Sequence, residues 1–168
     1  MPPTVREATP ADAARMITVQ EAAVRTRGTD AYTREQVEAW ASDRNPDEYP
    51  ITSPETEVLV AERDETVVGF GWLKPEADDY FDADVAGEIT AVYVHPAAAR
   101  EGVGATIYAR LEKVARKENL DSLGLWASLN AVPFYELQGF EPVTEQSLEF
   151  ESGVAVDVLE MKKELRRE

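Results

Sequence analysis

Hydrophobic residues recur along this chain with two different periods, which predicts a mixed α/β fold. Short apolar runs, and apolar residues at every second position, indicate strands. The seven expected strands cover residues 4–7, 57–61, 66–73, 85–94, 123–127, 140–150 and 154–161. Apolar residues three or four positions apart indicate helices, as Val103, Ile107, Leu111 and Val114 do. The four expected helices run from 10 to about 27, from 33 past 40, from 102 to 118 and from 131 to 137.

Local signals mark the ends of these elements. A capping pattern precedes each of the first two helices, and Gly28 ends the first. Three prolines between residues 43 and 54 indicate a loop, and turns are expected at 63–65 and 151–153. The chain has no internal repeat and no long linker. We therefore expect a single domain over residues 1–168, built on a mixed, mostly antiparallel sheet with helices on both faces.

The charge of the chain is strongly negative. It has 33 acidic and 17 basic residues and a net charge of −16, so it would repel nucleic acid and anionic membranes. The acids are spread along the whole chain, which favours adaptation to a salt-rich, halophilic cytosol. Recruitment of a cationic partner is the alternative. The absence of cysteine, of a secretory signal and of an apolar run near the ~20 residues that span a bilayer predicts a cytoplasmic protein without disulfides.

Residues 88–105 combine a strand, a glycine loop and the start of a helix. Gly102 and Gly104 open that helix, where exposed amides and the helix dipole attract an anion. A lone Gly-x-Gly is as often a structural turn. The strand directly before it, the helix directly after it and Arg100 at its mouth favour a phosphate site. A Walker loop is excluded because no Gly-Lys-Ser/Thr follows, and a dinucleotide loop because position 107 is isoleucine.

This segment resembles the GNAT superfamily of acetyl-CoA-dependent N-acetyltransferases. The family's loop, Gln/Arg-x-x-Gly-x-Gly/Ala, reads here as residues 99–104, after the strand end at 92–96. The resemblance implies the GNAT fold and acetyl-CoA as cosubstrate. Loop amides would cradle the pyrophosphate, and main-chain groups of the strand end would pair with pantetheine. The coenzyme-binding residues that it implies are Val92, Tyr93, Val94, Arg100, Glu101, Gly102, Val103, Gly104, Ala105, Ser128 and Asn130.

A second family motif follows the strand at 123–127. It reads Ala131-x-x-Phe134-Tyr135-x-x-x-Gly139-Phe140. The resemblance implies that the hydroxyl of Tyr135 protonates the departing thiolate, as a phenol that holds its proton at neutral pH can do. The alternative is that the aromatic residues of the motif only pack the core.

Two positions depart from the family pattern. Ala99 replaces the Gln or Arg of the loop, so Arg100 and the backbone amides must supply the contacts to the coenzyme. Ser128 stands where asparagine is common, and Asn130 is out of register. These departures leave a second hypothesis open, in which the domain is a coenzyme A sensor without turnover.

Acetyl transfer to an amine needs a general base, and Glu88 is the candidate. It lies fourteen residues before Gly102, where histone-acetylating members of the family carry their glutamate. The alternative is a solvated or arginine-paired glutamate at a strand end. His95, the one histidine, is expected to have a structural role in the loop, and no metal site is expected. Without cysteine to carry the acetyl group, direct attack in a ternary complex is favoured.

The expected acceptor is a primary amine of a small molecule or peptide, with protein-lysine or N-terminal acetylation as the alternative. The connection at 76–84 carries five acids with Tyr80 and Phe81 among them. It is expected either to steer a cationic amine toward the aromatic rings or to be a solvated acidic loop. The apolar final strands and the sheet edges also suggest a homodimer, without showing which edge pairs.

Overall fold

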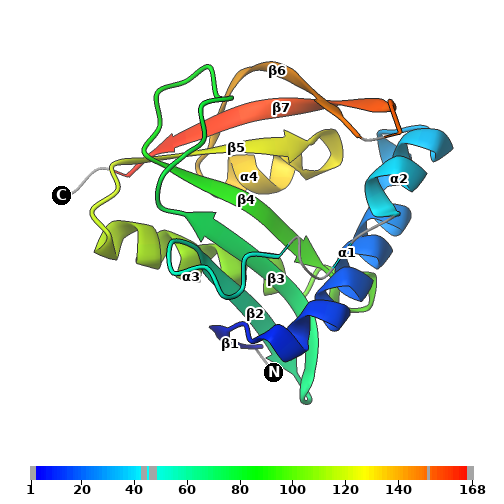
Figure 1. The fold of residues 1–168 in the computed structure, drawn as a ribbon, viewed down its shortest axis with the longest axis horizontal. Coiled ribbons are helices and arrows are strands. Elements are labelled where there is room, and N and C mark those ends of the chain that lie inside the picture. The colour runs from blue at the N-terminus through cyan, green and yellow to red at the C-terminus, as the bar shows by residue number, and fades with distance from the viewer. Residues whose placement is uncertain (1–2, 43–44, 46–48, 151, 166–168) are drawn as a thin grey trace.

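The computed structural model describes residues 3–42, 45, 49–150 and 152–165, and Figure 1 shows a twisted sheet with helices packed against it. The strands are β1 (Thr4–Glu7), β2 (Glu57–Arg63), β3 (Thr66–Lys74), β4 (Gly87–Val94), β5 (Ser122–Ser128), β6 (Glu141–Glu149) and β7 (Ala155–Glu164). The helices are α1 (Ala13–Arg27), α2 (Arg34–Ala41), α3 (Val103–Lys117) and α4 (Val132–Leu137). The predicted mixed α/β fold is confirmed.

The seven strands form one sheet in the order β1-β2-β3-β4-β5-β7-β6. Neighbouring strands are antiparallel except β4 and β5, which are parallel and are connected through α3. β4 and β5 share two residue pairs, Gly87 with Leu123 and Glu88 with Gly124. Beyond Glu88 the strands separate, while β4 stays paired with β3 as far as Val94. The sheet is therefore open as a wedge between β4 and β5.

The helix α3 covers one face of the sheet. Its residues Val103, Ile107 and Leu111 are at most 1% exposed, as the spacing of four predicts. Gly71 on β3 permits this close packing, because a Cβ there would lie 2.7 Å from the carbonyl oxygen of Ala91 and 3.1 Å from Ile107. The N-terminus of α3 is thereby fixed beside the end of β4.

The helices α1 and α2 cover the opposite face (Figure 1). Met16 and Val19 of α1 are fully buried in a cluster with Phe70 of β3. Val37 of α2 packs in a separate cluster with Val158 of β7. Helices on both faces of the sheet were predicted. α1 and α2 border the wedge on the face opposite α3.

Some strand ends differ from the prediction in either direction. The last strand, expected to end at Met161, continues to Glu164, because Lys162 and Lys163 still pair with β5. The strand expected from Val85 begins at Gly87. Of the expected loop at 43–54, residues 43, 44 and 46–48 lie outside the described residues, as does residue 151 of the last turn.

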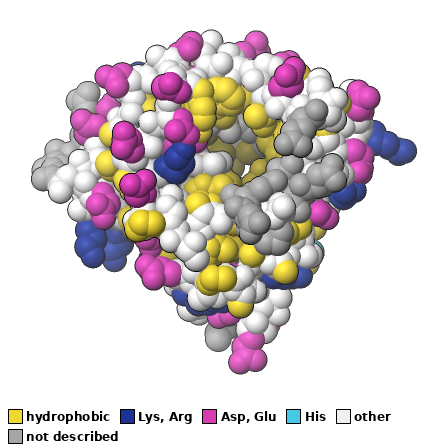
Figure 2. Space-filling view, in the orientation of Figure 1, with side chains coloured by type: hydrophobic (Ala, Val, Ile, Leu, Met, Phe, Trp, Pro, Cys, Tyr) yellow, Lys and Arg dark blue, Asp and Glu magenta, His cyan; other side chains and the backbone are white. Residues whose placement is uncertain are grey.

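Acidic side chains are scattered over the surface rather than gathered over one element, as Figure 2 shows for one face. The same face is hollowed near its centre, and hydrophobic side chains border the hollow (Figure 2). Within the described part of the chain, no helix has the length and apolar character needed to cross a membrane.

Candidate active site

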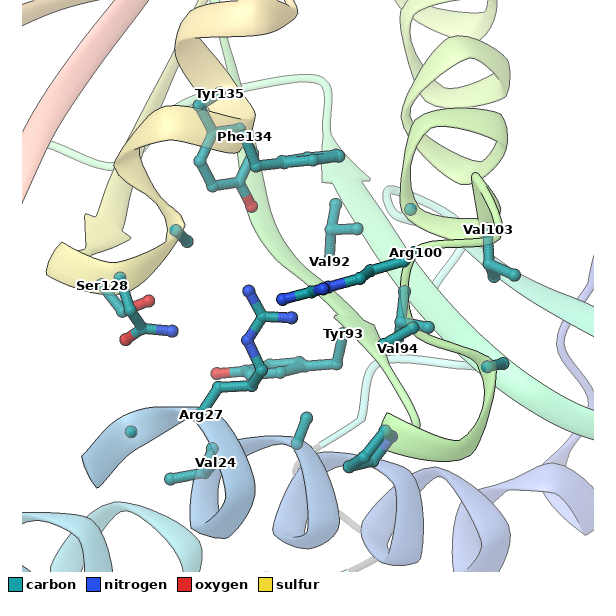
Figure 3. A pocket seen from close by; sticks show the side chains of 18 of the residues that line it. Val24, Arg27, Val92, Tyr93, Val94, Arg100, Val103, Ser128, Phe134 and Tyr135 are labelled. Atoms are coloured by element: carbon teal, nitrogen blue, oxygen red, sulfur yellow. The ribbon is translucent and has the colours of Figure 1, made fainter. Parts of the chain in front are cut away.

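A cavity of about 370 Å³ lies at the wedge between β4 and β5. Its walls come from α1, the end of β4, the glycine loop with the first turn of α3, and the segment from β5 into α4, and Figure 3 shows their side chains around one space. The wall includes all of the predicted coenzyme-binding residues except Glu101. These are Val92, Tyr93, Val94, Arg100, Gly102, Val103, Gly104, Ala105, Ser128 and Asn130.

Gly102 caps α3 in the left-handed conformation, with φ of +79°. A Cβ at this position would meet no atom within 4 Å, so glycine is needed for the backbone turn and not for packing space. The turn places the first amides of α3 at the cavity, and such amides have no acceptor within their own helix. The hydroxyl of Thr106 donates to the carbonyl of Gly102 at 2.9 Å, which holds this turn in place.

Glu101 and Arg100, adjacent in the loop, point in different directions. The carboxylate of Glu101 accepts a hydrogen bond from Arg63 at the end of β2, outside the cavity. Arg100 has a left-handed backbone, with φ of +64°, and its side chain extends across the cavity (Figure 3). The loop conformation thus brings one positive charge to the site and turns the negative charge away.

Tyr135 lies on α4 and is 6% exposed. Its ring packs against Phe134 and Phe140, with centroid distances of 5.0 and 5.8 Å, while its hydroxyl points into the cavity (Figure 3). Burial, and to a lesser degree the neighbouring Tyr93, raises the pKa of Tyr135 above its ordinary value of 10.0. The hydroxyl therefore holds its proton at neutral pH and faces the cavity.

Glu88 does not line the cavity. Its side chain is buried, and its carboxylate accepts hydrogen bonds from the hydroxyl of Tyr80 and from the amide of Asp78, the latter at 3.4 Å. The Nζ atom of Lys74 lies 3.7 Å from the same carboxylate. Four residues, or about 13 Å of extended strand, separate Glu88 from Val92. The structure thus brings Tyr135 together with the residues predicted to bind the coenzyme but leaves Glu88 at the closed end of the wedge.

The acidic connection at 76–84 folds back on the sheet and does not line the cavity. The rings of Tyr80 and Phe81 pack on Trp126, at centroid distances of 5.0 and 6.4 Å. Two amides of this connection donate to the fully buried carboxylate of Glu160, at 2.9 and 2.8 Å. The rings therefore pack on the sheet, although Tyr80 is still 43% exposed, and steering of a cationic amine stays a prediction.

Arg27, in the last turn of α1, lines the cavity and was missed by the sequence analysis. Its guanidinium points into the cavity toward that of Arg100 (Figure 3). The helical spacing could have indicated its position. Arg27 follows Ala23 by four residues and Val24 by three, so it lies on the same face of the helix. Those two residues are buried and also line the cavity.

An aromatic wall, formed by Tyr32, Trp40 and Tyr93, lies beside Arg27. The indole of Trp40 donates to the hydroxyl of Tyr93 at 3.2 Å. The hydroxyl of Tyr32 donates to the carbonyl of Asp157 at 2.6 Å and accepts from the amide of Leu129 at 2.9 Å. These bonds tie the wall to β4, β7 and the segment after β5, so its shape is fixed by the sheet.

His95 has a structural contact in the loop after β4. Its Nδ1 atom accepts a hydrogen bond from the amide of Ala97 at 3.0 Å, and the side chain does not line the cavity. Among the described residues, no group of three or more His, Asp or Glu side chains is arranged to hold a metal ion.

The fold and the cavity together place this chain among the acetyltransferases. It belongs to the acetyltransferase (GNAT) family, whose model matches residues 25–140. The resemblance that rested on the glycine loop and the tyrosine motif is thereby confirmed, and the chain is an acyltransferase by family. No curated protein matches its sequence.

Solved structures of this family cover nearly the whole chain. A GCN5-related N-acetyltransferase from Rhodopseudomonas palustris is 28% identical, with a TM-score of 0.85 over 98% of this chain and 97% of that one. A ribosomal-protein-alanine N-acetyltransferase from Brucella melitensis is 27% identical, with a TM-score of 0.63 over 96% and 99%. The yncA protein from Salmonella typhimurium, solved with its cofactor acetyl-CoA, is 22% identical, with a TM-score of 0.68; the alignment covers 100% of this chain and 96% of that one.

Proposed function

We propose that this protein transfers the acetyl group of acetyl-CoA to an amine of a small molecule or peptide, by direct attack within a ternary complex. The observation that carries the proposal is the wedge between β4 and β5. Beyond Glu88, the edge of β4 that faces β5 has no strand partner among the described residues. Its backbone groups as far as Val94 are open to an extended ligand, and the amides of pantetheine match such an edge.

The phosphate end of the coenzyme fits the glycine loop. The first amides of α3 lie beside the cavity, and Arg100 adds a positive charge. The space next to the Cα atom of Gly102 is open, because a Cβ there would meet no atom within 4 Å. A phosphate can therefore approach the backbone closely. Ala99 contributes no polar side chain here, so the loop binds through its backbone and Arg100.

In the proposed reaction, the amine nitrogen attacks the thioester carbonyl carbon. A C–N bond forms, the C–S bond breaks, and the departing thiolate takes the proton of Tyr135. The proton released by the amine passes through water to Glu88, because that carboxylate is not on the cavity wall. The products are an amide and the free thiol of coenzyme A. No residue carries the acetyl group, consistent with the absence of cysteine.

Acetyl transfer is tested by incubating the protein with acetyl-CoA and a panel of amino acids, polyamines, amino sugars and short peptides. Thiol release and the mass of the acetylated product are measured at low and high salt. The proposal predicts product formation with at least one class of amine. Tight binding of acetyl-CoA without product from any class would contradict it.

A coenzyme A sensor is the second candidate, and the position of Glu88 favours it. Its carboxylate is held by Tyr80 and Lys74 rather than facing the acceptor. In a sensor, acetyl-CoA and coenzyme A would bind and leave chemically unchanged. The turnover assay therefore separates the two functions.

Peptide N-termini form a second acceptor class beside small molecules. The supporting observation is the similarity to the Brucella protein, whose name gives an alanine of a ribosomal protein as its acceptor. A short peptide beginning with alanine belongs in the panel for this reason.

A further inference from the structure

The cavity is positively charged although the protein is strongly acidic. The chain has 33 acidic residues, yet among the described residues no Asp or Glu side chain lines the cavity, whereas Arg27 and Arg100 do. The two guanidinium groups enter the same space from different walls (Figure 3). This distribution favours a ligand with an anionic group.

Arg27 has no ion-pair partner among the described residues. Arg25, two positions earlier on α1, donates to Glu38 at 2.6 Å, so acids are within reach of this helix. The guanidinium of Arg27 instead points toward Arg100 (Figure 3). Both residues are solvent-exposed, so water screens part of the repulsion between the two like charges. An anion bound to Arg27 removes this repulsion and forms charge-assisted hydrogen bonds.

Arg27 enters the cavity from a different element than the glycine loop, which is proposed to hold the coenzyme phosphates. Arg100 belongs to the glycine loop, where the first amides of α3 already provide donors for phosphate. Arg27 comes from α1 on the other side of the sheet, beside Val24 and the aromatic wall of Tyr32, Trp40 and Tyr93. The surroundings of Arg27 thus combine a carboxylate-binding fork with an apolar surface.

We propose that Arg27 binds the carboxylate of the acceptor, and that the acceptor is an amino acid with an apolar or aromatic side chain. The inference rests on the proposed acetyl transfer and names its substrate class. A bidentate contact with Arg27 fixes the carboxylate, the aromatic wall takes the side chain, and the amine is left free for the thioester. Because the cavity wall has no acid to stabilise an ammonium group, the neutral, attacking form of the amine is favoured.

The test compares amino acids with the amines that lack only the carboxylate. The pairs are phenylalanine with phenethylamine, leucine with 3-methylbutylamine, and tryptophan with tryptamine. For the wild type we expect kcat/KM to be about 10- to 100-fold higher for the amino acid, the range of hydrogen bonds to a charged group. Arg27→Gln removes this preference, and Arg27→Lys keeps part of it. Arg34→Gln, an exposed arginine on α2 outside the cavity, keeps all of it.

A coenzyme phosphate as the partner of Arg27 gives a different result. Arg27→Gln would then raise KM for acetyl-CoA and leave the ratio between amino acid and amine unchanged, which overturns the inference. We expect the reverse, with the KM for acetyl-CoA raised by Arg100→Gln and unchanged in Arg27→Gln. Equal or better use of the decarboxylated amines by the wild type also overturns it.

Binding measurements separate this inference from the proposed function. The same amino acids are titrated calorimetrically into wild-type protein and Arg27→Gln, each saturated with coenzyme A. Binding that is lost in Arg27→Gln supports the carboxylate site even if no acetyl transfer occurs, in which case the proposed function alone fails. Transfer to other amines, without binding of any amino acid, overturns the carboxylate site and leaves the proposed function intact.

Discussion

Glu88 and Gly124 are the last paired residues of β4 and β5 before the two strands separate. The pair marks the closed end of the wedge, whereas Val92 and Val94 line its open part. In the proposed binding mode, an extended pantetheine that enters beside α3 would direct its thioester end toward Glu88. The proposed base would then lie near the reaction, although its carboxylate is not on the cavity wall.

Replacement of Glu88 by Gln tests the proposed base. We expect kcat to fall about 10- to 100-fold and KM for acetyl-CoA to stay unchanged. The fall in kcat is smaller than for a base that contacts the amine directly, because the proton passes through water. Steady-state kinetics with a saturating amine measures both constants. Glu76→Gln removes a carboxylate from the nearby connection and is the control. An unchanged kcat in Glu88→Gln excludes the role.

Replacement of Tyr135 by Phe tests the proposed acid. Because its hydroxyl faces the cavity and the proposed proton transfer is direct, we expect kcat to fall at least about 100-fold with the melting temperature unchanged. Tyr108→Phe is the matched control, since that buried hydroxyl donates to Glu112 at 2.8 Å away from the cavity. It is expected to lower stability by about 1 kcal/mol and to leave kcat unchanged.

The pH profile gives an independent measure of the same residue. Burial raises the pKa of Tyr135 above 10.0. Its hydroxyl therefore stays protonated throughout the physiological pH range and above the pH at which a free phenol ionises. We expect no loss of kcat due to this group between pH 7 and about pH 10. A tyrosine-dependent fall centred below pH 9, absent in Tyr135→Phe, would contradict the burial of a protonated acid.

Replacement of Gly102 by Ala tests the backbone turn of the loop. A left-handed residue other than glycine costs about 1–2 kcal/mol, and the strain distorts the amides proposed to bind phosphate. We expect weaker acetyl-CoA binding by calorimetry together with a lower melting temperature. Gly153→Ala is the control, because Gly153 also has a positive φ, of +89°, with no atom within 4 Å of a Cβ. We expect Gly153→Ala to lower the melting temperature about as much as Gly102→Ala does, but to leave the affinity for acetyl-CoA unchanged.

Asp12 is predicted to stabilise the junction between β1 and α1 in a pH-dependent way. Its carboxylate accepts bonds from Arg6 at 2.9 and 3.0 Å and from the amide of Thr9 at 2.8 Å. The Arg6 bonds lower the pKa of Asp12 in the folded protein below its ordinary value of 3.8. The carboxylate therefore contributes its full stabilisation above pH 3.8, and this contribution is lost as the pH falls through the pKa of the folded state. By chemical denaturation, Asp12→Asn should cost about 1–2 kcal/mol at pH 7 and less below about pH 4.

The edge strand β6 is one place where the predicted homodimer can be tested. This strand carries Glu141, Glu145 and Glu149, all exposed, and like charges on an edge oppose pairing with a second copy. If dimers form through β6, we expect them only at high salt, where the charges are screened. Light scattering at about 0.1 M and about 1 M salt measures this. A salt-independent dimer would place the interface elsewhere.

The sequence alone was sufficient for the elements, the fold class and the family. The residues that it predicted to bind the coenzyme, except Glu101, lie around one cavity. The stripe of Val103, Ile107 and Leu111 has the period of a helix, and the β4 pattern has that of a strand, because burial on one face imposes these periods locally. Gly102 and Gly104 were recognised because the turn before α3 needs a particular backbone. The residues of the glycine loop are consecutive, so their common location did not depend on the rest of the fold.

Tertiary structure decided what no local pattern records. The separation of β4 and β5 beyond Glu88 depends on how two parallel strands, joined through α3, pair across the sheet. The acidic connection was expected either to steer a cationic amine or to be a solvated loop. In the folded chain Tyr80 and Phe81 pack on Trp126, a contact that no local pattern records. Arg27 lies 73 residues before Arg100 in the sequence, so their convergence in the cavity is a property of the packing of α1 against the sheet. Periodicity follows from the burial of one face of a single element, whereas the charge and shape of the site depend on contacts between elements far apart in the chain.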